Sequence, residues 1–234
     1  DGNQFYSLFR DSKGFYWFGG ANGLIRFTDP AGERHDAIWY RMGDKTYPLS
    51  HNRIRHIYED KEQQLWIATD GSINRYDYAT RQFIHYNIVD NTGTYNTNWT
   101  YYIFEDTAGQ LWISTCLGGI FVVDKHKLMQ STSGQYIAEQ NYSVHNGLSG
   151  MFINQIIPDN EGNVWVLLYN NKGIDKINPR TREVTKLFAD ELTGEKSPNY
   201  LLCDEDGLLW VGFHGGVMRI NPKDESQQSI SFGS

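Results

Sequence analysis

Short runs of apolar residues alternate with polar turns along the whole chain. The clearest stretch is 102–124, which reads YIFEDTAGQLWISTCLGGIFVVD. It contains an apolar run, a turn closed by Gly109, a second run through Trp112, a Gly-Gly break and a third run. Apolar runs of about four to eight residues bounded by turn residues are typical of β-strands. The stretch therefore predicts three short strands joined by tight turns.

The same pattern occurs five times, and a Trp marks each copy. Every Trp has an Asp six positions before it, and four of the five also have a Gly three positions before it. The Asp and Trp pairs are Asp11 and Trp17, Asp60 and Trp66, Asp106 and Trp112, Asp159 and Trp165, and Asp204 and Trp210. Successive Trp residues are 49, 46, 53 and 45 positions apart. A period of this size indicates a repeat architecture.

Each copy has room for four short strands. The expected strands are 5–9, 15–19, 24–27 and 38–40; 54–59, 65–69, 73–76 and 83–86; 102–104, a strand through Trp112, 120–123 and one near 136–142; 152–157, 164–168, 174–177 and 184–188; and 200–203, 208–212, 217–220 and 230–232. Gly, Pro, Asn and Asp fill the connections, including an expected turn at 29–32. No segment has the pattern of a long amphipathic helix.

Four-stranded units at this period predict an all-β fold, a β-propeller of four-stranded antiparallel blades. One such sheet cannot bury both of its faces, whereas neighbouring blades around a common axis cover each other. The chain, 1–234, is then one propeller domain or a propeller fragment, with blades at about 5–45, 52–90, 99–143, 150–190 and 197–234. Five blades could close a small ring or belong to a larger, seven-bladed propeller, and the sequence leaves both open.

The recurring Asp and Gly are explained by the turn between the first two strands. The Asp carboxylate can accept the backbone N–H groups of the turn, and Gly supplies a residue with positive φ. Gln63 stands where the other copies have Gly, and a positive φ there would cost about 1 kcal/mol. Calcium binding is disfavoured, because each turn offers one carboxylate and Ca²⁺ takes about six to eight oxygens.

The charge balance argues against nucleic acid as a partner. The chain has 21 basic and 28 acidic residues, a net charge of −7, and no basic cluster. The longest apolar runs are far too short to span a membrane. The chain opens at Asp1 without the pattern of a signal peptide, so we expect an excised or processed fragment.

Catalytic and metal motifs find little support. None of the seven His has metal-ligand spacing, the Gly-x-Ser-x-Gly motif is absent, and the paired acids recur at the turn position. We therefore expect no cofactor and no metal. Cys116 and Cys203 occupy different places in non-adjacent copies, so we expect free thiols rather than a disulfide.

The repeated motif resembles the two-component regulator propeller repeat. The resemblance is carried by IFEDTAGQLWIST at 103–115, by Glu59-Asp60 with Leu65-Trp66 in the second copy, and by 205–212 in the fifth. The segments 49–52 and 147–149 look like the usual lead-in to a blade of this family. All five copies share the resemblance, so it covers nearly the whole chain.

This resemblance implies a sensor role. Proteins similar to this family are mostly hybrid two-component sensor kinases of Bacteroides-type gut bacteria. They carry a periplasmic part with about two propellers and an immunoglobulin-like domain, a membrane helix that anchors the protein in the inner membrane, and a cytoplasmic kinase. Their ligands are typically oligosaccharides. The segment itself is then a periplasmic sensor and not an enzyme, with the other domains of the parent chain, a second copy and an oligosaccharide as its expected partners.

The residues eleven positions before each Trp are the first candidates for a ligand site. All have polar tips at the start of the innermost strand, and they are Tyr6, Arg55, Tyr101, Asn154 and Asn199. We call this set the polar ring. Such a ring suits hydroxyl-rich ligands, or else it serves channel waters and backbone groups. Trp99, in the polar loop before Tyr101, and His214, in a connection from second to third strand, are further candidates.

The sequence is also compatible with two other functions. The segment could be a structural or dimerisation unit without its own ligand site, with exposed aromatic residues such as Trp39 and Trp99 as contact surfaces. A propeller lyase or glycosidase is the third reading, and it would require a metal or two opposed carboxylates at the channel mouth.

Overall fold

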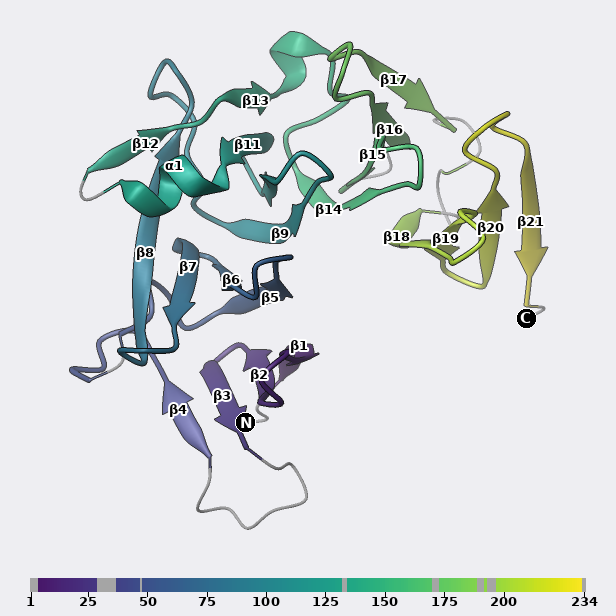
Figure 1. Ribbon diagram of the computed structural model, residues 1–234. Helices are drawn as coiled ribbons and strands as arrows, with labels where there is room; N and C mark the ends of the chain where they lie inside the picture. The colour runs from purple at the N-terminus through teal and green to yellow at the C-terminus, as the bar shows by residue number, and fades with distance from the viewer. Residues whose placement is uncertain are drawn as a thin grey trace.

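A computed structural model describes residues 4–28, 37–46, 48–131, 134–169, 173–188, 192 and 197–232. Its strands form five antiparallel blades that fan around a common axis as an open arc (Figure 1). The all-β propeller fold predicted from the repeats is confirmed. The turn expected at 29–32 lies outside the described residues.

The blades follow one another in chain order, and the first strand of each lies nearest the axis. Blade 1 contains β1 (Phe5–Arg10), β2 (Tyr16–Gly20), β3 (Gly23–Phe27) and β4 (Ile38–Tyr40); blade 2, β5 (Ile54–Glu59), β6 (Leu65–Thr69), β7 (Ser72–Asp77) and β8 (Gln82–Val89); blade 3, β9 (Thr100–Glu105), β10 (Gln110–Thr115), β11 (Ile120–Asp124) and β13 (Gln140–Tyr142); blade 4, β14 (Ile153–Pro158), β15 (Val164–Leu168), β16 (Ile174–Ile177) and β17 (Val184–Leu187); and blade 5, β18 (Pro198–Cys203), β19 (Leu209–Phe213), β20 (Gly216–Ile220) and β21 (Gln227–Ser231).

The insertion in blade 3 is built differently from the prediction. The fourth strand expected near 136–142 is confirmed only for its last part: β13 pairs with β11, whereas β12 (Gln135–Ile137) pairs in parallel with β8 of blade 2. A short helix, α1 (Lys125–Gln130), precedes β12, and the side chain of Asp124 caps it. The outermost strand of a blade leaves its outer N–H and C=O groups unpaired, so the inserted chain can add a fifth strand to blade 2.

The core lies between neighbouring blades. The Trp of blade 1 packs with Ile54 and Leu65 of blade 2, and the Trp of blade 4 packs with Leu209 of blade 5. Trp17, Trp66 and Trp165 are fully buried, whereas Trp210 is only partly buried, since no described blade follows it. Burial between sheets therefore stabilises the array, as expected of wedge-shaped repeats.

The Asp at each turn has two tasks. In blade 1, Oδ1 of Asp11 accepts hydrogen bonds from the backbone N–H groups of Lys13 and Phe15 at 3.1 and 2.8 Å. Oδ2 of Asp11 accepts a hydrogen bond from the indole Nε1 of Trp17 at 2.8 Å. The predicted structural role is confirmed, and the indole contact explains the fixed spacing of six residues. Gln63 has a φ of 62°, so its turn has the same geometry as the Gly-containing turns.

Glutamates before two of these Asp residues hold adjacent blades together. Glu59 of blade 2 accepts a hydrogen bond from the backbone N–H of Ser12 in blade 1 at 2.9 Å. Glu105 of blade 3 accepts the equivalent bond from the N–H of Lys61 in blade 2 at 2.8 Å. The paired acids predicted to be structural are thus used between blades. Blades 4 and 5 have Pro158 and Cys203 at this position.

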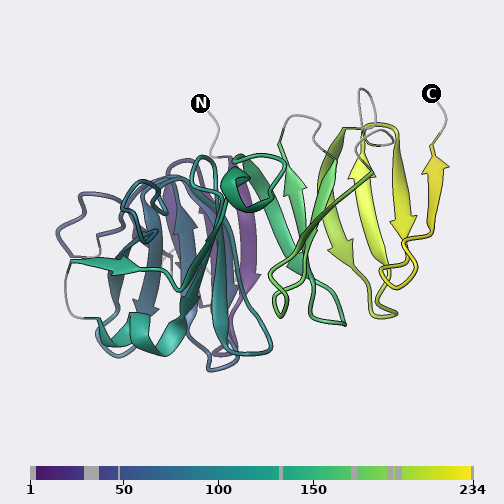
Figure 2. The same cartoon turned by 90° about the horizontal axis from the view of Figure 1, so that it is seen from above.

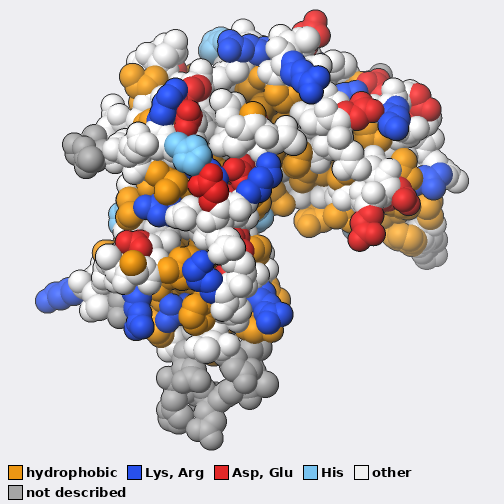
Figure 3. Space-filling view, viewed as in Figure 1, with side chains coloured by type: hydrophobic (Ala, Val, Ile, Leu, Met, Phe, Trp, Pro, Cys, Tyr) orange, Lys and Arg blue, Asp and Glu red, His pale blue; other side chains and the backbone are white. Residues whose placement is uncertain are grey.

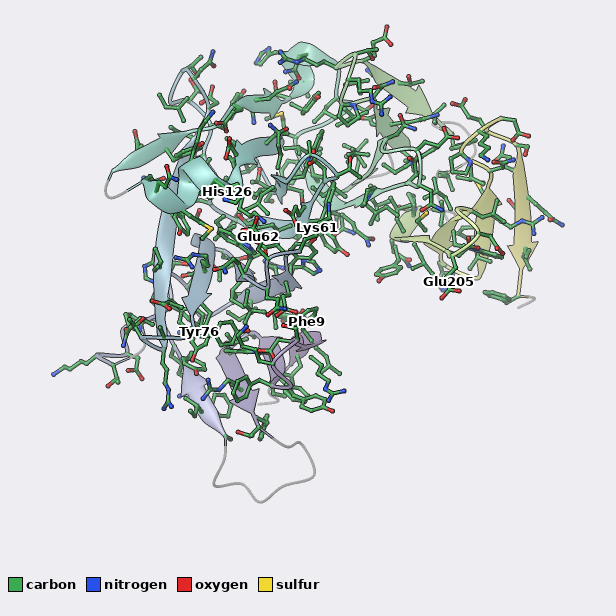
Figure 4. The ribbon with its side chains drawn as sticks, in the orientation of Figure 1. Phe9, Lys61, Glu62, Tyr76, His126 and Glu205 are labelled. Carbon is green, nitrogen blue, oxygen red and sulfur yellow. The ribbon has the colours of Figure 1, made fainter. Side chains whose placement is uncertain are left out.

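A buried lysine adds to the connection between blades 2 and 3. Lys125 is 1% exposed, and its Nζ lies 2.8 Å from Glu105 and 3.3 Å from Asp60. Burial opposes the charge on Lys125, but the hydrogen bond and charge of Glu105 and the charge of Asp60 outweigh it and raise the pKa of Lys125. Lys61, Glu62 and His126 lie close together beside this cluster, where α1 approaches the β5–β6 turn (Figure 4).

The arc is not closed by strand pairing. Among the described residues, no strand of blade 1 is hydrogen-bonded to blade 5, and Phe9 and Glu205 lie on opposite sides of the opening (Figure 4). The space-filling view shows this opening as a broad notch with apolar side chains along its inner margin (Figure 3). Apolar residues are exposed at both ends, as Leu8 at 66% and Leu202 at 52% illustrate.

Candidate functional site

The axis-facing strands of the five blades line a cavity of about 690 Å³. All five residues of the polar ring contribute to its lining, so the structure brings together what the alignment of the repeats predicted. They are Tyr6, Arg55, Tyr101, Asn154 and Asn199. The start of each first strand pairs with the end of the second strand, as Phe5 does with Gly20, so the ring lies toward the mouth that receives the connections from second to third strand. The short helix α1 lies toward the opposite ends of the strands (Figure 2). Whether this ring binds a ligand stays a prediction.

Arg55 is the most firmly held member of the ring. Its Nε and Nη2 donate to the two carboxylate oxygens of Asp70 at 2.6 and 3.1 Å. Its guanidinium also lies over the ring of Tyr101, 4.4 Å from the centroid. Burial works against the charge of Arg55, but Asp70 outweighs it and raises the pKa of Arg55. The cation is therefore fixed in place, and the face of Tyr101 is partly covered.

The other ring members keep hydrogen-bonding capacity. Burial raises the pKa of Tyr101, so its hydroxyl stays protonated and able to donate. Asn154 donates from Nδ2 to the carbonyl oxygen of Asn199 over a long distance of 3.5 Å. Tyr6 is 48% exposed, and its hydroxyl donates to Gln4 at 3.0 Å. The mouth thus presents hydroxyl and amide groups that can exchange partners with a hydroxyl-rich ligand.

Sequence reasoning missed the side chains one position further along each first strand. His56 stacks on Tyr102 of the next blade with ring centroids 3.7 Å apart. Gln155 exchanges two hydrogen bonds with the backbone of Leu201, at 2.8 and 2.9 Å. Burial lowers the pKa of His56 to about 4, against a weaker opposing effect of its bond with Ile103. The signal was available, since these residues stand ten positions before the Trp in their repeats.

Trp99 and His214 do not line the axial cavity. Trp99 directly precedes β9, is 46% exposed and has a φ of 55°. His214 is exposed in the connection between β19 and β20. Trp99 therefore belongs to the rim of the mouth, while the structure gives His214 no contact that supports a ligand role. Asn170, in the equivalent connection of blade 4, lies outside the described residues.

A second hollow, of about 650 Å³, lies between the outer parts of blades 2 to 4 and includes Asp90, His145 and Arg182. Asp90 is committed to internal contacts, because its oxygens accept hydrogen bonds from the backbone N–H of Tyr95 and from Thr92. Burial opposes the charge of Asp90, but these bonds outweigh it and lower the pKa of Asp90. We therefore favour the axial mouth as the candidate site.

Among the described residues, no three His, Cys, Asp or Glu side chains are arranged to hold a metal ion. Cys116 and Cys203 are both free, as expected from their positions. In the described part of the chain, no helix is long and apolar enough to cross a membrane.

Comparison with family models gave one match. The model of the two component regulator propeller matches residues 1–22 and 48–71, which cover the start of blade 1 and the first half of blade 2. The comparison with curated proteins gave no match.

Solved structures extend this similarity to the whole chain. The extracellular domain of a candidate one component system of Bacteroides thetaiotaomicron is 98% identical, with a TM-score of 0.95 over all of this chain and 31% of that one. The extracellular domain of a candidate hybrid two component system of the same organism is 20% identical, with a TM-score of 0.77 over 99% of this chain and 30% of that one. This chain spans about a third of either.

A more distant likeness concerns the fold alone. The virginiamycin B lyase of Staphylococcus aureus is 14% identical, with a TM-score of 0.66 over 98% of this chain and 70% of that one.

The family match and the near-identical extracellular domain agree with the motif in all five repeats. They confirm the predicted resemblance of this chain to the two-component regulator propeller repeat.

Proposed function

We propose that this propeller is the ligand-sensing segment of a periplasmic signalling region and that it recognises an oligosaccharide at its axial mouth. The family match and the near-identical extracellular domain support a sensor segment. The location in the periplasm and an anchor of the parent protein in the inner membrane are part of the same proposal.

The observation that carries this proposal is the convergence of five polar side chains from five different strands on one cavity. Tyr101, Asn154 and Asn199 offer hydroxyl and amide groups, and Arg55 offers a fixed cation. Pockets of this kind combine a concave surface with a few polar groups that set ligand orientation. A carbohydrate matches them, since each sugar hydroxyl both donates and accepts hydrogen bonds.

The class of signalling protein that contains this segment differs between the resemblance and the solved structure. The sequence led us to expect a hybrid two-component kinase, but the 98%-identical structure comes from a candidate one component system. We propose that the segment has no enzymatic activity of its own and that other domains of the parent protein transmit its signal. A further propeller, an immunoglobulin-like domain and a second copy of the chain are its proposed partners.

A structural or dimerisation role is the second candidate. It is favoured by the exposed apolar residues at the two ends of the arc, which include Leu8, Leu202 and Phe232. In that case the ends would pack on other parts of the parent chain or on a second copy. Sedimentation of the full-length protein at several concentrations separates the readings, because a strictly monomeric protein excludes dimerisation.

Calorimetric titration of the full-length protein with oligosaccharides tests the proposed function. We expect one or more β-1,4-linked tetraoses of glucose, galactose, mannose or xylose to bind, and Tyr101→Ala to weaken that binding at least about tenfold. Val144→Ser, at an exposed residue outside the axial cavity, is the control and should bind normally. Absence of binding to the whole panel contradicts the proposal.

A further inference from the structure

Two neighbouring blades carry a large aromatic residue at a position where the other blades do not. Trp99 in blade 3 and Phe152 in blade 4 both stand thirteen positions before the Trp of their repeat. The equivalent residues of blades 1, 2 and 5 are Gln4, Arg53 and Ser197. Repeat symmetry thus places two aromatic residues at equivalent positions of neighbouring blades.

A repeated backbone contact fixes this position. The carbonyl oxygen of Trp99 accepts a hydrogen bond from the N–H of Cys116 at 2.9 Å, and that of Phe152 accepts one from Tyr169 at 2.9 Å. Arg53 and Asp70 form the same bond in blade 2 at 3.2 Å. Each aromatic residue is therefore tied to the connection between the second and third strands of its own blade, and Tyr169 adds a third aromatic ring.

These rings are exposed although they are large. Trp99 is 46% exposed, Phe152 41% and Tyr169 62%. Trp99 also has a φ of 55°, a conformation that costs a residue other than Gly on the order of 1 kcal/mol. An exposed group of aromatic residues that includes a strained backbone is typical of an interaction site rather than of a folding element.

A small hollow of about 180 Å³ opens beside two of these rings, those of Phe152 and Tyr169, whereas Trp99 does not line it. Cys116 and Ile153, both buried, contribute to it, and so do Phe152 and Tyr169. Its remaining lining residues, Tyr101 and Asn154, also line the axial cavity. The apolar hollow is therefore continuous with the polar ring, but only over blades 3 and 4.

We propose that Trp99, Phe152 and Tyr169, the aromatic mouth cluster, bind the apolar face of a sugar ring off the propeller axis. The hydroxyl groups of that sugar then reach Tyr101 and Asn154, while Tyr6 and Asn199 lie beyond it. Pyranose rings have one face rich in C–H groups, and aromatic rings provide a large rigid surface for it. This inference rests on the proposed function and gives the ligand a location within the mouth.

The combination of groups favours a sugar over a protein segment as the occupant. An apolar protein contact would offer no further hydrogen bond to the Tyr101 hydroxyl or the Asn154 amide, and each polar group left unsatisfied on burial costs about 1–3 kcal/mol. A sugar satisfies both groups and the aromatic faces together. The cluster also occupies a small sector of the mouth, in keeping with one or two sugar units.

The test uses full-length protein and the same four β-1,4-linked tetraoses, titrated into single variants. Trp99→Ala, Phe152→Ala and Tyr169→Ala should each weaken binding about three- to tenfold. Tyr6→Ala and Asn199→Ala should weaken it less than any of these three, and the control Val144→Ser should leave it unchanged. Thermal unfolding identifies any variant that fails to fold. A change in tryptophan fluorescence on binding should disappear in Trp99→Phe, which keeps an aromatic ring.

The outcomes separate this inference from the proposed function. Loss of affinity in Tyr6→Ala and Asn199→Ala, with normal affinity in the three cluster variants, overturns the off-axis location and leaves the sensor role standing. Failure of every tetraose to bind the wild-type protein overturns both. Selective loss in the cluster variants supports both.

Discussion

The indole Nε1 of Trp66 donates a hydrogen bond to Oδ2 of Asp60 at 2.9 Å, and both side chains are buried. The equivalent bond occurs in all five blades, at 2.7 to 2.9 Å. In blades 1 to 4 the Asp thereby links the turn of its blade to a Trp that packs against the next blade. One six-residue spacing sets both local turn geometry and packing between blades.

Removal of this carboxylate should be costly. In Asp159→Ala the fully buried Nε1 of Trp165 loses its acceptor, so we expect a loss of about 2–4 kcal/mol in unfolding free energy. Urea unfolding measures it. Asp206→Ala, at an exposed residue of the next turn, is the matched control and should stay within about 0.5 kcal/mol of wild type. A small effect of Asp159→Ala would show that the indole contact contributes little.

Two substitutions at the turn residue with positive φ should change the unfolding free energy in opposite directions. Gln63 has a φ of 62°, whereas Gly14 has a φ of 88° with no atom within 4 Å of an added Cβ. Gln63→Gly should therefore raise the unfolding free energy by up to about 1 kcal/mol, and Gly14→Ala should lower it by about 1 kcal/mol. Thermal unfolding of the two variants checks the sign, and a destabilised Gln63→Gly would refute backbone strain at this turn.

His56 should make the fold sensitive to mild acid. Its pKa is about 4 in the folded protein and about 6.5 in the unfolded chain. Below pH 6.5 the unfolded chain therefore binds a proton that the folded protein does not accept until about pH 4, so stability falls across this window. Between pH 7 and pH 5 the loss attributable to His56 is up to about 2 kcal/mol.

Comparison with His56→Gln isolates this contribution, because other titrating groups are common to both proteins. Urea unfolding at pH 7 and pH 5 should show a smaller loss in the variant than in wild type. Equal losses in the two proteins would mean that His56 is accessible to protons in the folded state.

Much of this structure was predictable because its determinants are local and repeated. The turn Asp, the buried Trp and the polar ring follow from residues at fixed distances within one repeat, and their alignment predicted where they lie. The pairing of β12 with β8 was not predictable in the same way, since it depends on how far an inserted segment reaches toward another blade. No spacing within the third repeat encodes that contact.

The aromatic mouth cluster was predictable from the sequence only in part. Trp99 stood out because it lies in a polar loop, whereas Phe152 was included in the predicted strand 152–157. In the structure Phe152 precedes β14 and is 41% exposed. The apolar run 152–157 gave no reason to separate Phe152 from the strand. Only its equivalence to Trp99 in the repeat alignment distinguishes it.

The most direct test of the central claim, that the axial mouth binds the ligand, is hydrogen exchange of the full-length protein with and without a saturating oligosaccharide from the panel. The account predicts slower exchange at 99–103 and 152–156, where the first strands of blades 3 and 4 begin, and little change in the outer strands β8 and β21. Protection confined to outer strands, or none at saturation, would contradict it.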